Sequence, residues 1–124
     1  MRRIVFRALP ALVSAGVLFV AGSPMADAAV QGHAAATTTI SVKATEYKFT
    51  LSKKSLSKPG KVIFNVVNKG TIPHDFKIDG KQTALLSPGQ SAKLTVTLKK
   101  GSFPYMCTVS GHAALGMKGT FKVL

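Results

Sequence analysis

The chain has 124 residues, a formal net charge of +13 from 17 Lys and Arg against 4 Asp and Glu, and a single Cys. This length allows one ordinary domain or two very small ones, and 46% apolar with 17% charged residues exclude a disordered chain. The single Cys excludes an intramolecular disulfide, and the positive excess raises nucleic acid, anionic membranes and acidic proteins as candidate partners.

The N-terminal segment has the order of a secretory signal peptide. Three arginines within residues 2–7 precede an apolar run over residues 8–22, and the small-residue sequence Ala26-Asp27-Ala28 follows. This order predicts a signal peptide at residues 1–28 with cleavage after its last residue. The alternative is an uncleaved membrane anchor, although the apolar run is shorter than the ~20 residues that a spanning helix needs. We expect export to the periplasm, cell envelope or extracellular space, with membrane association only if the segment stays uncleaved.

The positive charge beyond the predicted signal peptide is all lysine. Residues 29–124 carry 14 Lys, three acidic residues and no Arg, which gives a net charge of +11. Arginine supplies the planar bidentate contacts by which proteins read phosphate and guanine. We therefore expect no nucleic-acid partner. The dispersed lysines leave two interpretations open, a solvated surface or a face that steers an acidic protein.

After a low-information stretch at residues 29–37, which we expect to be a flexible tether, residues 38–124 form one domain with an apolar period of two. Alternating runs, each typical of a strand with one solvent-facing side, occupy residues 40–45, 47–52 and 91–99. In the second run, Tyr47 shares the apolar side with Phe49. The stretch 61–68 is more continuously apolar, as in a central strand. About seven to eight short strands separated by turn residues predict an all-β Greek-key β-sandwich.

Two further predicted strands carry the residues that could bind a metal or take part in chemistry. Phe103, Tyr105 and Cys107 alternate on the apolar side of a strand at residues 102–107. His74 shares the apolar side of its own strand with the next alternate residues, whereas Asp75 is expected to face outward. The alternation therefore directs both His74 and Cys107 into the sandwich.

Cys107 is followed by His112 and then Met117 at equal intervals, and His74 lies upstream. An unpaired thiol in an exported protein is prone to oxidation, so some form of protection is expected. Two imidazoles and a thiolate in a plane, with a weak thioether on the axis, are the ligand set of a type 1 copper site. A lone buried Cys or Met more often packs in a core, but the four residues together favour a metal site.

The segments NKGTIPHDF at 68–76, LSPGQ at 86–90 and YMCTVSGHAALGMKG at 105–119 carry a family likeness. Residues 38–124 resemble a cupredoxin, a small blue copper protein like plastocyanin or azurin. The ligand-loop spacing is most similar to that of rusticyanin, auracyanin and sulfocyanin. The resemblance implies one type 1 copper ion per chain that cycles between Cu(I) and Cu(II), with His74, Cys107 and His112 as strong ligands and Met117 as the axial one.

The resemblance also implies roles for neighbouring residues. In many cupredoxins the residue after the first His ligand is Asn, whose backbone N–H donates to the thiolate and whose side chain ties the ligand loops together. Here that residue is Asp75, whose side chain is expected to reach toward Thr108, and a carboxylate near copper is expected to favour the oxidised state. Pro73 is expected on the loop that faces His112.

A metal held in a closed frame offers no position for substrate, so we expect an electron carrier and not an enzyme. His112 is the expected exit for the electron, within a small uncharged platform formed by Ala113, Ala114 and Leu115. Such a surface suits brief docking by a monomer to redox donor and acceptor proteins, which peripheral lysines would steer if they are acidic. The alternatives are a copper-binding or trafficking protein of the cell envelope, and a purely structural sandwich. The chain lacks the extra Met and His residues expected for handing copper on.

Overall fold

The structure is a computed structural model that describes Gly16 and residues 36–124. The predicted signal peptide at residues 1–28, Gly16 apart, and the greater part of the predicted tether at residues 29–37 lie outside the described residues. Both boundaries therefore stay predictions. Within the part of the chain that is described, there is no helix with the length and apolarity needed to cross a bilayer.

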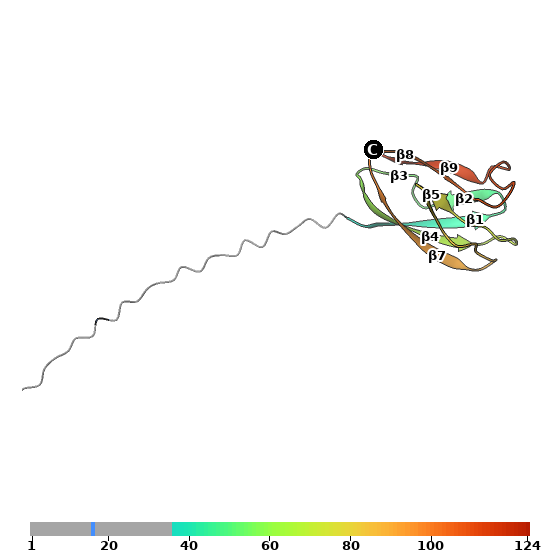
Figure 1. The fold of residues 1–124 in the computed structure, drawn as a ribbon, viewed down its shortest axis with the longest axis horizontal. Helices are drawn as coiled ribbons and strands as arrows, with labels where there is room; N and C mark the ends of the chain where they lie inside the picture. Colours follow the sequence, from blue (N-terminus) through green and yellow to red (C-terminus); the bar gives the residue numbers. More distant parts are fainter. Residues whose placement is uncertain (1–15, 17–35) are drawn as a thin grey trace, which may run out of the picture. The chain divides into compact units, whose positions relative to one another are not determined.

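Residues 38–124 form an all-β sandwich, which confirms the predicted fold class (Figure 1). Its nine strands are β1 (Thr38–Thr45), β2 (Lys48–Leu51), β3 (Ser55–Leu56), β4 (Gly60–Asn68), β5 (Lys77–Ile78), β6 (Lys81–Gln82), β7 (Ser91–Leu98), β8 (Gly101–Met106) and β9 (Lys118–Val123). The count exceeds the seven to eight that were predicted because β3 and β6 have only two residues each. Strands of that length are too short to show an alternating pattern.

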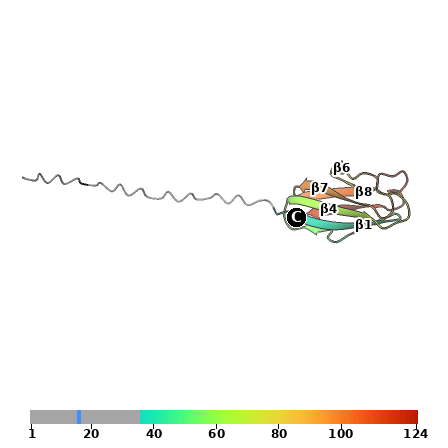
Figure 2. The ribbon, with the colours of Figure 1, turned by 90° about the horizontal axis from the view of Figure 1, so that it is seen from below.

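The strands form two mixed sheets. One has the order β2-β1-β4-β7 and the other β3-β9-β8-β5-β6. β1 and β4 run parallel, side by side, as Figure 2 shows, whereas β4 pairs with β7 in antiparallel register. β4 therefore has a partner on each side, as its continuous apolar sequence predicts.

The core lies between the sheets and consists of side chains from the inner face of each strand. Its largest fully buried members include Phe64 on β4, Phe76 before β5 and Phe121 on β9. The ring of Phe64 lies 5.2 Å from that of Phe76 and 5.6 Å from that of Phe121, measured between centroids. Replacing one such Phe by Ala lowers the free energy of unfolding by about 3–5 kcal/mol. This aromatic cluster therefore fixes the sheet that contains β8, the strand before Cys107, against the other sheet.

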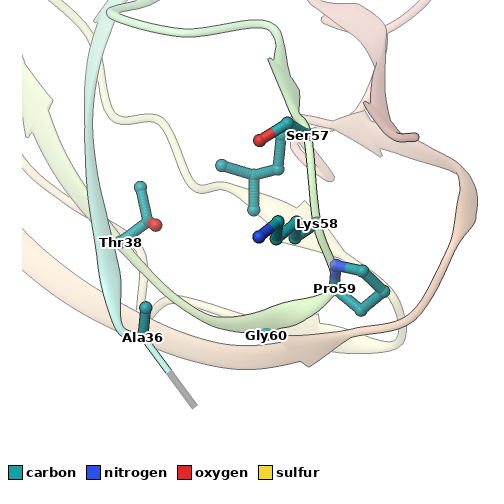
Figure 3. Close-up of a pocket in the computed structure, with 7 residues that line it drawn as sticks. Ala36, Thr38, Ser57, Lys58, Pro59 and Gly60 are labelled. Carbon is teal, nitrogen blue, oxygen red and sulfur yellow. The ribbon is translucent and has the colours of Figure 1, made fainter.

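The two ends of the sandwich differ in the chemistry of their side chains. Near the starts of β1 and β4, a small cavity of about 170 Å³ is lined by Ala36, Thr38, Leu56, Ser57, Lys58, Pro59 and Gly60 (Figure 3). This lining has one charged side chain and no carboxylate, imidazole or thiol. The opposite end, where β1, β4 and β8 finish, carries the loops with His74, Cys107 and His112.

Candidate metal centre

Three of the four residues in the predicted ligand set converge in a buried cluster. The Nδ1 atoms of His74 and His112 lie 3.2 Å apart, and the Sγ atom of Cys107 lies 3.5 Å from His112 Nδ1. One donor atom from each of the three residues lies within 4.8 Å of the others. His74 and Cys107 are at most 1% exposed, and His112 is 8% exposed.

This geometry fits one type 1 copper ion. With typical metal bond lengths of ~2.0 Å to nitrogen and ~2.3 Å to thiolate, three donors in a plane around a common centre lie about 3.5–3.8 Å apart. The distance of 3.5 Å lies at the lower limit of this range, and that of 3.2 Å is slightly shorter. The donor chemistry, two imidazoles and one thiolate, also suits copper.

The side chain of Asn68, at the end of β4, holds the segment that carries His74 before β5. The Asn68 amide donates to the carbonyl oxygens of Ile72 and Leu86, both at 2.8 Å, and its own oxygen accepts the N–H of Gly70 at 2.8 Å. His74 exchanges two backbone hydrogen bonds with Leu86 as an isolated bridge, so it precedes the regular strand instead of lying within it. Sequence reasoning placed Asn68 at the end of a strand and at the start of a family-like segment, and missed its role as an anchor.

The loop after β8 brings Cys107, His112 and Met117 together through its own backbone. The N–H of Cys107 donates to Met117 O at 3.0 Å, and the N–H of Met117 donates to His112 O at 3.1 Å. Successive turns between these residues include Gly111 and Gly116, whose φ angles of 82° and 108° favour glycine. Met117 is fully buried. The Met117 side chain therefore lies inside the sandwich, and its backbone is hydrogen-bonded to Cys107 and His112, as its proposed role as a ligand requires.

Opposing effects act on the thiol of Cys107, which is the free cysteine of the described residues. Burial raises the pKa of the Cys107 thiol, whereas hydrogen bonds from the backbone of Asp75 and Val109 lower it. Burial also lowers the pKa of His74, with the neighbouring His112 acting in the same direction. A buried neutral imidazole with a free lone pair is the form that binds a metal.

Asp75 is buried, at 4% exposure, so the expectation that it faces outward was wrong. Its Oδ1 accepts the backbone N–H of Thr108 at 2.6 Å, and its Oδ2 accepts the Thr108 hydroxyl and, at 2.8 Å, the Gln82 amide. Because these hydrogen bonds draw the carboxylate toward the loop that follows Cys107, Asp75 does not follow the alternation of a strand. The expected link between the two ligand loops is thus present. Sequence reasoning missed Gln82, because β6, the strand that positions it, has only two residues and shows no pattern in the sequence.

Tyr47 also differs from its expected place on the inner side of a strand. It precedes β2 with a φ of 62° and is 38% exposed, because the chain turns there between β1 and β2. Its ring meets the ring of His112 edge to face, with centroids 5.2 Å apart. The preceding residue, Glu46, contacts the loop that carries His74. Both contacts are absent from the sequence reasoning, which placed no site residue in this turn.

The surface around His112 is small and uncharged. Pro73, Ala114 and Leu115 are exposed, with Leu115 at 62%, and Ala113 is half-buried. His112 itself is buried, at 8% exposure.

Comparisons with known proteins agree with this fold. A family model described as a cupredoxin-like domain matches residues 11–121, whereas no curated protein sequence matches the chain significantly. Reduced auracyanin from Roseiflexus castenholzii is similar at 22% identity and a TM-score of 0.61, over 72% of this chain and 98% of that one. Auracyanin A, a "blue" copper protein from Chloroflexus aurantiacus, gives 19% identity and a TM-score of 0.60 over 72% and 100%. Rusticyanin from Thiobacillus ferrooxidans gives 23% and 0.58 over 71% and 77%.

Copper enzymes are similar too, but over smaller shares of their lengths: 42% of a multicopper oxidase and 41% of the copper nitrite reductase of Nitrosomonas europaea. At these identities the solved structures establish the fold, and the family model covers most of the chain. With the sandwich and the converging donors of His74, Cys107 and His112, the conclusion is that the chain belongs to the cupredoxin family.

Proposed function

We propose that this protein is an exported type 1 copper protein that carries single electrons between redox partners. The observation that carries the proposal is the buried cluster of His74, Cys107 and His112 beneath a small uncharged surface. When bound, copper supplies one-electron chemistry by alternating between Cu(I) and Cu(II). The rest of the mechanism comes from how the chain holds the donors.

The chain holds the proposed ligands in a frame that does not depend on solvent. Asn68 and the bridge to Leu86 fix His74, while the backbone bonds of Met117 fix both Cys107 and His112. Donors that are fixed in this way rearrange little between the two oxidation states, so outer-sphere electron exchange is fast. Met117, as a weak axial thioether, would adjust the reduction potential while contributing little to metal retention.

The same closure argues against catalysis at this site. Four proposed ligands, all buried, leave no open position for a substrate. The matching copper enzymes are much longer chains of which this fold is only a part. An electron carrier is therefore the function that this single domain supports best.

The ring of His112 is the proposed route for the electron. The surrounding platform of Ala113, Ala114 and Leu115 can be covered and uncovered with little desolvation of charge, which suits brief encounters. We propose that the protein acts as a monomer and that its lysines steer acidic redox donor and acceptor proteins toward this platform. Export to the periplasm, cell envelope or extracellular space remains part of the proposal and follows from the predicted signal peptide.

Copper trafficking without electron transfer is the alternative. It requires that copper leave readily, whereas the three donors found together are buried in two loops that hydrogen bonds hold in place. Transfer of copper to a strong chelator separates the two functions. A carrier releases copper slowly and exchanges electrons fast, and a trafficking protein does the reverse.

Electron self-exchange between oxidised and reduced copies of the protein tests the proposal without a known partner. Leu115→Lys places a charge on the platform and is expected to slow self-exchange roughly tenfold, equivalent to about 1.4 kcal/mol, with no change in the copper spectrum. Leu124→Lys is the matched control, because Leu124 is similarly exposed, at 66%, but follows β9 at the other end of the sandwich. Equal rates for both variants would contradict the proposed electron route.

A further inference from the structure

The turn between β1 and β2 contacts both histidine-bearing loops, although it contributes none of the proposed ligands. Glu46 Oε1 accepts the backbone N–H of Thr71 at 2.5 Å and that of Ile72 at 3.2 Å. The next residue, Tyr47, packs its ring against His112 at a centroid distance of 5.2 Å. Two adjacent residues therefore reach two loops that lie far apart in the sequence.

The contact on the His74 side is built around a carboxylate. The Thr71 hydroxyl also donates to Glu46 Oε1, at 3.2 Å, and a side chain at position 70 would collide with this carboxylate, so Gly70 leaves room for it. The hydrogen bonds, chiefly that from the Thr71 backbone, lower the pKa of Glu46 to about 2. Glu46 is thus an anion at any physiological pH.

His74 has a nitrogen that lacks an acceptor. Its Nδ1 faces His112, while its Nε2 is fully buried and has no hydrogen-bond partner among residues 36–124. The nearby Glu46 Oε1 lies 3.7 Å from this Nε2, just beyond hydrogen-bond distance. Once the Nδ1 lone pair is given to a metal, the ring proton must sit on Nε2, and a buried N–H requires an acceptor. Metal-bound histidines commonly donate this second N–H to a carboxylate.

The contact on the His112 side is built around an aromatic ring in a constrained turn. Tyr47 adopts a φ of 62°, which is uncommon for a residue other than glycine, and its carbonyl oxygen lies beside Gly116 in the second ligand loop. The two rings are nearly perpendicular, at 82°, which is a favourable arrangement for aromatic pairs. The phenol ring therefore limits rotation of the imidazole while its own outer side stays exposed.

We propose that Glu46 and Tyr47 are positioning residues for the two histidine ligands: Glu46 accepts the Nε2–H of copper-bound His74, and Tyr47 fixes the ring plane of His112. This inference rests on the proposed ligand roles of both histidines. The negative charge beside His74 stabilises Cu(II) more than Cu(I), so Glu46 lowers the reduction potential. It also raises the affinity for Cu(II).

Glu46→Gln tests the first half of the proposal. The variant is expected to bind Cu(II) roughly 10–100-fold more weakly and to show a positive shift of the reduction potential. In the diamagnetic reduced protein, the His74 Nε2–H resonance is expected to move upfield and to exchange faster with water. Asp79→Asn is the matched control, because it removes one carboxylate from an exposed turn whose φ of 50° Asn tolerates. If Glu46→Gln matches this control in affinity, potential and resonance position, the role of Glu46 is wrong.

Tyr47→Gly and Tyr47→Phe test the second half. Glycine removes the ring and suits the left-handed turn, so the hairpin still forms, and phenylalanine keeps the ring. We expect Tyr47→Phe to retain the wild-type copper spectrum and Tyr47→Gly to change the copper hyperfine pattern. Identical spectra for wild type and Tyr47→Gly would overturn the role of Tyr47. A wild-type protein without blue absorption would instead overturn the ligand assignment, so the two failures are distinguishable.

Discussion

The two loops that carry the candidate ligands are held in different ways. Residues 68–76, which include His74, are fixed by side chains: Asn68 binds two carbonyl groups and Glu46 binds two amides. Residues 107–117 are held mainly by their own backbone, through the bonds that join Cys107, His112 and Met117. The first loop therefore depends on particular polar residues, whereas the second depends on loop length and on glycines at fixed positions.

The largest expected effect follows from removing the anchor of the first loop. Asn68 is fully buried, and Asn68→Ala leaves two carbonyl groups and one N–H without this partner. We expect the free energy of unfolding of the metal-free protein to fall by roughly 2–4 kcal/mol, measured by urea denaturation. Asn65→Ala, at a half-buried position on the same strand, is the control and should cost about 1 kcal/mol or less. Equal losses would show that Asn68 has no special role.

The second loop should respond to backbone strain instead. Gly111 has a φ of 82° and no atom within 4 Å of an added Cβ, so any cost of Gly111→Ala comes from conformation alone. We expect a loss of about 1–2 kcal/mol in the free energy of unfolding. Gly111→Asn, which tolerates this backbone region better, should recover part of the loss in the same measurement. Unchanged stability of the Ala variant would contradict the dependence on glycine.

Asp75 and Thr108 join the two loops, and a conservative change there should have a smaller structural effect. Asp75→Asn keeps an oxygen for the Thr108 N–H but loses an acceptor for Gln82 or the Thr108 hydroxyl. We expect the unfolding free energy to fall by about 1 kcal/mol. Potentiometry of the copper-loaded variant should show a positive shift, because a negative charge near the metal is removed. A negative shift would contradict the proposed effect of this carboxylate.

The smallest expected effect is on the stability of the metal-free protein at low pH. Because the folded protein lowers the pKa of Glu46 from 4.5 to about 2, its stabilising contribution is complete above pH 4.5 and is lost as the pH falls toward 2. In the metal-free protein, the difference in melting temperature between wild type and Glu46→Gln should shrink over this interval. A difference that grows toward low pH would have the wrong sign.

Much of this contrast between the loops could be predicted from sequence. Alternation located β1, β7 and β8, and it directed both His74 and Cys107 into the sandwich, while a continuous apolar run located β4. The equal spacing of Cys107, His112 and Met117 also identified the second loop, because a self-contained loop keeps its donors close in the chain. The all-β sandwich prediction is confirmed.

The contact between Glu46 and the first loop could not be predicted, because Glu46 and Thr71 are 25 positions apart and no pattern in the sequence joins them. The link from Asp75 to Thr108, 33 positions apart, was expected only from the family resemblance. Alternation placed Asp75 outside and Tyr47 inside, and both were wrong for local reasons: a carboxylate bound to a backbone amide, and a turn with positive φ. Polar side chains at loop ends obey hydrogen-bond geometry more than the period of a strand.

The visible and paramagnetic resonance spectra of the Cu(II)-loaded protein test the central claim most directly. If His74, Cys107 and His112 bind copper as a type 1 site, the wild-type protein shows an intense blue thiolate-to-copper absorption and a narrow copper hyperfine splitting. Cys107→Ser should lose both features while keeping the sandwich fold. A wild-type protein without these features, or a Cys107→Ser variant that retains them, would contradict the account.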